Sequence, residues 1–165
     1  MSLNSFNINS LYILLYIGHD PPQPNNFHWA FYFHRDHQQG GTKYHVKDIG
    51  QGWIADHSDI RFIMKEFLLV GLFKIADVPH GQEDFLDQTM RTFDDKLNTP
   101  ETTCRVWILW VFDILQQPRD GQRILKSNDL AKLEIEIKEW GNQCAMSAAR
   151  NEQPRPVCAP LLCGL

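Results

Sequence analysis

The sequence lacks a hydrophobic run long enough to cross a membrane. The longest apolar stretch near its start covers residues 11–17, and no basic residue precedes it. A membrane-spanning helix needs about 20 apolar residues, and a secretory signal carries basic residues ahead of its apolar region. We therefore predict no transmembrane segment and interpret residues 11–17 as a buried strand.

Cysteine is scarce and unevenly distributed. The N-terminal half has none, and the four cysteines of the chain are Cys104, Cys144, Cys158 and Cys163. Small secreted proteins that depend on disulfides are dense in cysteine, which this chain is not. We expect a reduced, cytoplasmic setting, and a bridge between Cys158 and Cys163 is left open.

A basic patch is also missing. The 16 Lys and Arg residues are scattered along the chain, and 20 acidic residues outnumber them, so the net charge is −4. Nucleic-acid-binding proteins gather Lys and Arg on one face or along one helix. We therefore predict no nucleic-acid partner and expect a small-molecule substrate instead. The sequence does not fix an oligomeric state.

Length and composition indicate one packed domain. The chain has 165 residues, of which 43% are hydrophobic and 22% are charged. These values are ordinary for a globular protein with a sizeable core. We assign residues 1–150 to a single domain and residues 151–165 to a C-terminal tail.

The first half of the chain is dominated by strand signals. Segments rich in β-forming residues predict strands at 11–17, 27–33, 42–46 and 67–75. A loop with three prolines follows the first of these strands. Gly40-Gly41 predicts the turn of a hairpin between the second and third strands.

Helical spacing appears in the second half. Apolar residues predict an amphipathic helix over residues 83–97, and cap candidates at residues 127–129 predict a last helix that runs to about residue 149. Between them, residues 104–115 are apolar nearly all round, which is typical of a helix buried on several sides. We predict an α+β fold in which a mostly antiparallel sheet packs on a central buried helix that starts at Cys104.

Cys104 and two histidines form a candidate thiol site. The first turn of a helix favours a thiolate, because unpaired N–H groups and the macrodipole stabilise negative charge there. An imidazole can take the thiol proton, and a third polar group can orient that imidazole. Alternation places His28 opposite to the core residues Trp29 and Phe31. His45 can interact with His28 if it lies across from it, or two residues diagonal to it, on the paired strand.

Each of these residues also has a structural interpretation. Free cysteine is among the most buried residue types and often serves as a small hydrophobe. A strand histidine is more often a packed residue than a catalytic one. An oxyanion would be bound by the backbone N–H of Cys104 and a second donor. The aromatic candidates for that donor are Tyr12, Tyr16 and Tyr32, although strand tyrosines more often serve in packing.

The order of the candidate residues resembles the permuted papain-like superfamily. This superfamily includes the lecithin retinol acyltransferase-like acyltransferases and phospholipases and is related to the NlpC-type peptidases. Its members show a strand that opens His-Trp-Ala-hydrophobic-Tyr, a second strand with another His, and a downstream Cys that begins a buried helix. The matching segments are His28-Trp29-Ala30-Phe31-Tyr32, Tyr44-His45-Val46 and Cys104. The chain also looks like small fungal proteins with this layout.

The resemblance implies a cysteine-dependent hydrolase or acyltransferase without a cofactor. In that case Cys104 is the nucleophile, His28 the base and His45 the orienting group. The family often has Asn before the Cys, whereas Thr103 stands here, and no hydrophobic anchoring tail follows. A soluble acyl, amide or ester compound is therefore a more suitable substrate than a membrane phospholipid.

Other functions stay open. The chain is alternatively a non-catalytic member of the same fold that binds a small molecule or a protein, or a natural-product tailoring enzyme that uses the same thiol for cyclisation. A metal site would draw on loop residues, namely His19, Asp20, His34, Asp36, His37, Asp56 and His57. No Cys-x-x-Cys or His-Glu-x-x-His spacing accompanies them, so we predict no metal.

Overall fold

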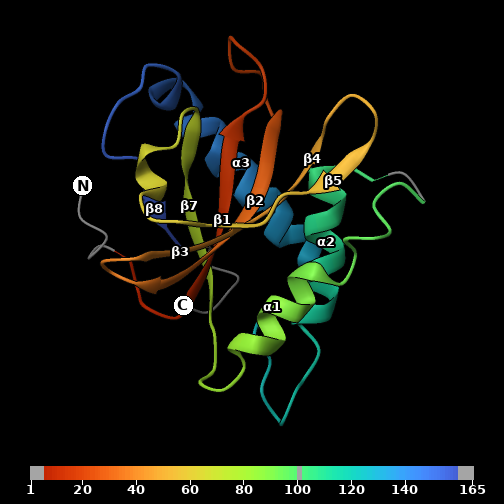
Figure 1. Ribbon diagram of the computed structural model, residues 1–165. Coiled ribbons are helices and arrows are strands. Elements are labelled where there is room, and N and C mark those ends of the chain that lie inside the picture. The colour runs from red at the N-terminus through yellow and green to blue at the C-terminus, as the bar shows by residue number, and fades with distance from the viewer. Residues whose placement is uncertain (1–5, 100–101, 160–165) are drawn as a thin grey trace.

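The architecture is a twisted sheet with its three α-helices on one face and at one edge, and with the short 3-10 helix on the other face (Figure 1). The computed structural model describes residues 6–99 and 102–159. Within these residues the strand order is β6-β3-β2-β1-β7-β8, and β4 and β5 form a separate hairpin. The strands are β1 Ser10–Ile17, β2 Phe27–Asp36, β3 Gly40–Tyr44, β4 Val46–Asp48, β5 Trp53–Ala55, β6 Ser58–Ile60, β7 Leu69–Asp77 and β8 Val157–Cys158. The helices are the short 3-10 helix η2 Ile63–Lys65 and the α-helices α1 Glu83–Arg91, α2 Cys104–Leu115 and α3 Leu130–Ala149.

The sheet is antiparallel except where β8 joins β7 in parallel. In the central pair, Tyr16 of β1 lies across from His28 of β2. On the other side of β2, Phe31 lies across from Tyr44 of β3. The predicted α+β class with a mostly antiparallel sheet is therefore confirmed, and so is the strand predicted at residues 11–17.

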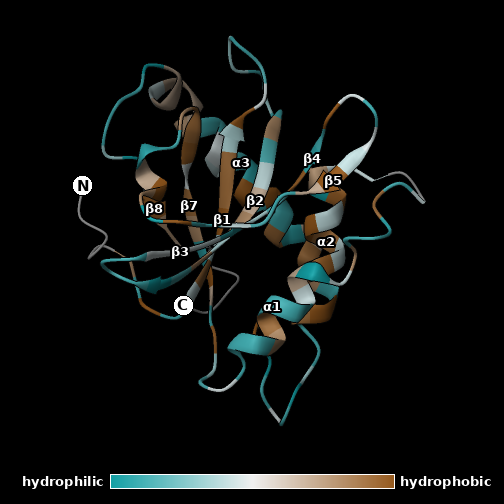
Figure 2. Cartoon of the chain, in the orientation of Figure 1, coloured by the Kyte–Doolittle hydropathy of each residue, from teal (hydrophilic) through white to brown (hydrophobic). Residues whose placement is uncertain are grey.

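The two faces of the sheet are covered by different parts of the chain. Trp29, Phe31 and Phe33 point to the face covered by α2 and α3, as the alternation predicts. Tyr32 points to the opposite face, where Ile63 of η2 belongs to a second hydrophobic cluster. The central strands β1 and β7 are predominantly hydrophobic along their length (Figure 2), because both of their faces are buried.

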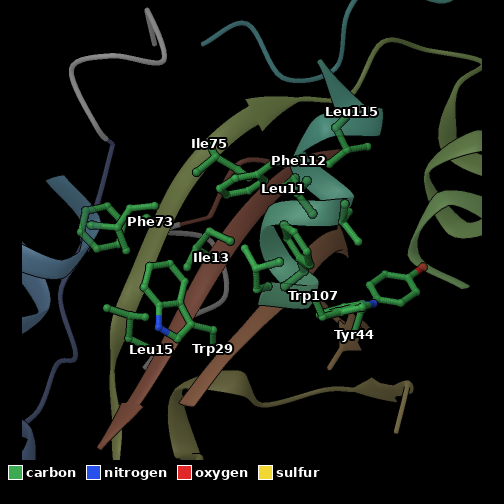
Figure 3. Close-up of a cluster of buried hydrophobic side chains, with 14 of the residues drawn as sticks. Leu11, Ile13, Leu15, Trp29, Tyr44, Phe73, Ile75, Trp107, Phe112 and Leu115 are labelled. Carbon is green, nitrogen blue, oxygen red and sulfur yellow. The ribbon is translucent and has the colours of Figure 1, made fainter. Parts of the chain in front are cut away.

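Helix α2 begins at Cys104, as the sequence predicts. The Thr103 side chain accepts a hydrogen bond from the backbone N–H of Val106, which caps the first turn. Trp107 and Phe112 of α2 meet Phe31 edge-on, with ring centroids 5.5 and 5.8 Å apart. Figure 3 shows these α2 side chains against the core residues of the sheet. The helix is thus central to the core that carries the candidate site.

Two local predictions were wrong. The helix expected over residues 83–97 begins at Glu83 but ends at Arg91, because the next backbone N–H groups, those of Thr92, Asp94 and Lys96, donate to carbonyls three residues back instead of four. Gly40 and Gly41 do not form the hairpin turn but begin β3, while Asp36 closes the turn by accepting two backbone N–H bonds. A Cβ on Gly41 would lie 1.9 Å from the Phe33 carbonyl oxygen, so the close approach of β2 and β3 needs glycine.

Part of the segment expected as a C-terminal tail lies on the sheet. Residues 157 and 158 pair with β7 through Leu72 and Phe73. Arg155 is buried, and its Nε donates a hydrogen bond to the Leu69 carbonyl at 2.6 Å. A two-residue parallel pairing has no sequence period, which explains why the strand was not predicted. Among the described residues, no helix has the length and apolar character required to span a membrane.

Candidate active site

The two candidate histidines are in direct contact. His28 Nε2 lies 2.9 Å from His45 Nδ1. His45 directly follows β3, and continuing the pairing of Phe31 with Tyr44 places it across from Ala30, diagonal to His28. The register condition drawn from the sequence is therefore met. The ring of Tyr16 covers the other side of His28, with centroids 5.9 Å apart.

An aspartate completes the histidine pair. Asp56 Oδ2 lies 3.2 Å from His45 Nε2 and 3.0 Å from Lys47 Nζ. Its backbone N–H donates to the His45 carbonyl at 2.9 Å, so the two residues face each other at the base of the β4–β5 hairpin. From the sequence alone, Asp56 is a candidate only as a metal ligand. Asp56 reaches His45 because β4 pairs with β5 in a hairpin. These strands have three residues each, which is too short for a recognisable alternation in the sequence.

The order of these contacts determines where the protons lie. A carboxylate only accepts hydrogen bonds, so His45 Nε2 carries a proton and donates it to Asp56. His45 Nδ1 is then an acceptor, and His28 Nε2 donates to it. His28 Nδ1 is consequently left with a free lone pair. Asp56, His45 and His28 thus form a hydrogen-bonded relay, and its outer atom, His28 Nδ1, can accept a proton at the start of β2.

Burial keeps both imidazoles neutral. Burial, with help from the charge of Lys43, lowers the pKa of His45 from 6.5 to about 4. Burial and the neighbouring His45 lower the pKa of His28 to about 4 as well. The hydrogen bond from Lys47 lowers the pKa of Asp56, which stays ionised. At neutral pH the site therefore holds a carboxylate and two uncharged rings, which is the state that the tautomer argument requires.

Cys104 lies beside the same end of β2. Burial raises the pKa of its thiol, whereas hydrogen bonds from the backbone N–H groups of Trp29 and Arg105 act in the opposite direction. Trp29 directly follows His28, so the thiol and the histidine pair are neighbours along the strand. The described residues show no hydrogen bond between the thiol and either ring. The expected low thiol pKa is wrong for the resting protein, because burial outweighs the helix start.

The remaining cysteines are separate from this site. Cys144 and Cys158 are free thiols on α3 and β8. Burial raises the pKa of Cys158 to about 12 and also raises that of Cys144. The bridge left open between Cys158 and Cys163 lies partly outside the described residues. Of the described cysteines, Cys104 is the one at a helix start beside a histidine.

The loop histidines and the tyrosines make other contacts. His34 bonds Tyr32 and His37, at 2.8 and 3.1 Å, on the far end of β2. Among the described residues, no group of three or more His, Cys, Asp or Glu side chains is arranged to hold a metal ion. Tyr16 donates to Glu66, and the Tyr12 hydroxyl accepts from a backbone N–H. Within the described part of the chain, none of the Tyr12, Tyr16 and Tyr32 hydroxyls is hydrogen-bonded to the Cys104 thiol.

One protein family matches the chain. The model of DUF6914, a family of unknown function, covers residues 9–147. The chain belongs to this family. No curated protein and no solved structure matches it. The DUF6914 region contains the whole relay, His28, His45 and Asp56, together with Cys104.

Proposed function

We propose that this DUF6914 protein is a cysteine-dependent hydrolase or acyltransferase that acts on a soluble acyl, amide or ester compound. Cys104 is the nucleophile, His28 the general base and His45 the orienting group. The observation that carries the proposal is the chain of contacts from Asp56 through His45 to His28, which leaves His28 Nδ1 free to accept a proton.

The chemistry follows that of other thiol nucleophiles. His28 Nδ1 takes the Cys104 proton while the sulfur attacks the substrate carbonyl carbon, and the new imidazolium then gives its proton to the leaving group. Backbone N–H groups at the start of α2 stabilise the oxyanion of the tetrahedral intermediate. Water, or an acceptor hydroxyl or amine, then attacks the thioester, with His28 again as the base. This step releases the acid or the transferred product and restores the thiol.

The pKa values favour general-base catalysis over a preformed ion pair. The Cys104 thiol keeps its proton at neutral pH because burial raises its pKa, and His28 is neutral. Proton transfer therefore accompanies the attack rather than preceding it. Catalytic hydrogen bonds are often long before substrate binds and tighten in the substrate complex. A substrate carbonyl at the mouth of α2 would draw the thiol and His28 together.

The resemblance to the permuted papain-like superfamily supports the same assignment. In that superfamily a histidine strand, a second histidine strand and a cysteine helix follow in this order. Here His28 and Cys104 lie at the starts of β2 and α2, and His45 directly follows β3. Membership of the superfamily is part of the proposal.

A binding function is the second candidate. The observation in its favour is an apolar hollow of about 350 Å³ between the segment after α1 and the outer face of α2, lined by Phe93, Lys96, Thr99, Trp110, Asp113 and Ile114. A hollow of this size suits a small apolar ligand. If compounds bind there and Cys104 never becomes acylated, the non-catalytic alternative is the correct one.

Acyl trapping tests the proposed function. The protein is incubated with p-nitrophenyl esters of short acids, and acylated cysteines are located by peptide mass spectrometry. We expect one acyl group on Cys104, much slower acylation in His28→Ala, and none at that position in Cys104→Ala. Cys144 and Cys158 serve as internal controls for intrinsic thiol reactivity. Equal acylation of all three thiols, or none, would contradict the proposal.

A further inference from the structure

We infer that His57 is a positioning residue, which fixes His45 relative to the start of α2 and is itself fixed by Asp94. The inference rests on the proposed function of the site, because it names the residue that holds the relay in place. It concerns a second imidazole–carboxylate pair next to the one formed by His45 and Asp56.

His57 uses both of its ring nitrogens. The backbone N–H of His45 donates to His57 Nδ1 at 3.2 Å. On the other side of the ring, His57 Nε2 lies 2.9 Å from Asp94 Oδ1. Because a backbone N–H only donates and a carboxylate only accepts, the His57 proton must be on Nε2. Asp94 thus fixes the tautomer of His57 as Asp56 fixes that of His45.

The His57 ring is also clamped between two aromatic residues. Its side chain is only 2% exposed. The Tyr44 ring, at the end of β3, lies with its centroid 5.4 Å away. The Trp107 ring of α2 is stacked on it at 5.9 Å with an interplanar angle of 25°. Trp107 lies one turn from Cys104, so His57 touches both the backbone of the orienting histidine and the helix that begins with the nucleophile.

A second contact holds the same hairpin to the same segment. The Asn98 side chain accepts a hydrogen bond from the Trp53 backbone N–H at 2.8 Å and donates one to the Trp53 carbonyl at 2.9 Å. Trp53 begins β5 and His57 follows its end, so the strand before Asp56 is held at both sides by residues 94–98. Asp56 is therefore presented to His45 on a supported strand rather than on a free loop.

Packing alone does not require a histidine here. A phenylalanine would fill the space between Tyr44 and Trp107 without the cost of burying a polar ring. What only the imidazole supplies is an acceptor for the His45 N–H and a donor to Asp94. Small displacements of catalytic groups are expensive, since about 1 Å can cost about 100-fold in rate. The pair is therefore placed where it controls the geometry of the relay.

The test measures the proton position on His45 as well as reactivity. The variants are His57→Phe, which keeps the ring but removes both hydrogen bonds, and His57→Asn, whose side-chain oxygen can still accept from the His45 N–H. Asp94→Ala removes only the anchor of His57, and the neighbouring exposed Asp95→Ala is its matched control. Nitrogen-15 spectra of the histidine rings report the tautomer of His45, and acyl trapping reports the reactivity of Cys104.

We expect His57→Phe to give a mixture of His45 tautomers and to slow Cys104 acylation by roughly tenfold or more, up to about 100-fold. Asp94→Ala should show a smaller change in the same direction, His57→Asn should recover part of the loss, and Asp95→Ala should match the wild type. If His57→Phe melts at a lower temperature but keeps one His45 tautomer and the wild-type acylation rate, His57 is only structural and the inference is overturned.

Asp94→Ala keeps the test decisive if His57→Phe does not fold, because Asp94 is partly exposed and its loss leaves the aromatic packing in place. Failure of the proposed function would look different. In that case Cys104 of the wild type would not be acylated at all, whereas the tautomer of His45 would still respond to His57 and Asp94.

Discussion

His28 Nε2 lies 2.9 Å from His45 Nδ1, and this contact joins the start of β2 to the base of the β4–β5 hairpin. Asp56 determines which ring donates in this hydrogen bond, because it accepts the proton on the opposite nitrogen of His45, Nε2. The hydrogen bonds therefore have one polarity: His28 donates to His45 and His45 donates to Asp56, so that His28 Nδ1 keeps its lone pair. That polarity leaves a lone pair on His28 Nδ1 while both rings are uncharged, which is what the proposed role of His28 as the base requires.

Asp56→Asn should change the proton positions on His45 and His28 while keeping the side chain at position 56 the same size. An amide can donate to His45 Nε2 and so permit the opposite tautomer, which removes the acceptor that His28 faces. We expect acylation of Cys104 to fall by about tenfold or more. Asp48→Asn, on the exposed part of the same hairpin, is the matched control and should react like the wild type. An unchanged rate in Asp56→Asn would show that the tautomer does not matter.

Stability should fall as the buried histidines become protonated. The pKa of His28 and His45 drops from 6.5 to about 4 on folding, so the unfolded chain binds more protons between these values. Their contribution to stability is complete above about pH 6.5 and is lost as the pH falls toward about 4. The slope should approach about 1.4 kcal/mol per pH unit for each histidine. Urea unfolding at several pH values measures it.

His28→Gln should give a shallower slope than the wild type over the same pH range. His34 has its own pKa lowered to about 4 by burial, so part of the slope should remain. His80, whose side chain is fully exposed, provides the control, and His80→Gln should leave the slope unchanged. A pH-independent stability in the wild type would contradict the neutral, buried state of the pair.

Thr103→Ala should weaken the start of α2. The Thr103 hydroxyl accepts the Val106 N–H at 3.2 Å, and loss of such a cap costs about 1 kcal/mol of stability. Thermal or urea unfolding should show this loss, and Thr103→Ser should recover most of it. A variant as stable as the wild type would mean that the first turn of α2 does not depend on its cap.

The sequence was sufficient for features that depend on a period or a cap. Alternation along residues 27–33 separates the core residue Trp29 from His28, and the apolar run over residues 104–115 predicts the helix that starts at Cys104. The sequence predicts the contact between His28 and His45 only for a register that places them opposite or diagonal to each other, and the continued pairing of Phe31 with Tyr44 gives that register.

The remaining site residues depend on tertiary structure. Asp56 and His57 follow a three-residue strand in a hairpin too short to show alternation, and the partner of His57 is Asp94, far along the chain. The helix start alone predicts a lowered pKa for the Cys104 thiol. Its actual direction is set by burial, which depends on how α2 packs on the sheet. Neither feature has a local signal.

The most direct test of the central claim is the rate at which iodoacetamide alkylates Cys104 as a function of pH, in the wild type and in His28→Ala. If His28 is the base, the wild type should react roughly tenfold or more faster than His28→Ala at neutral pH, where the thiol still holds its proton. The difference in rate should vanish at high pH, where the thiol ionises without proton transfer to His28. Equal and slow alkylation of both proteins at neutral pH would contradict the claim and leave Cys104 as a packed core residue.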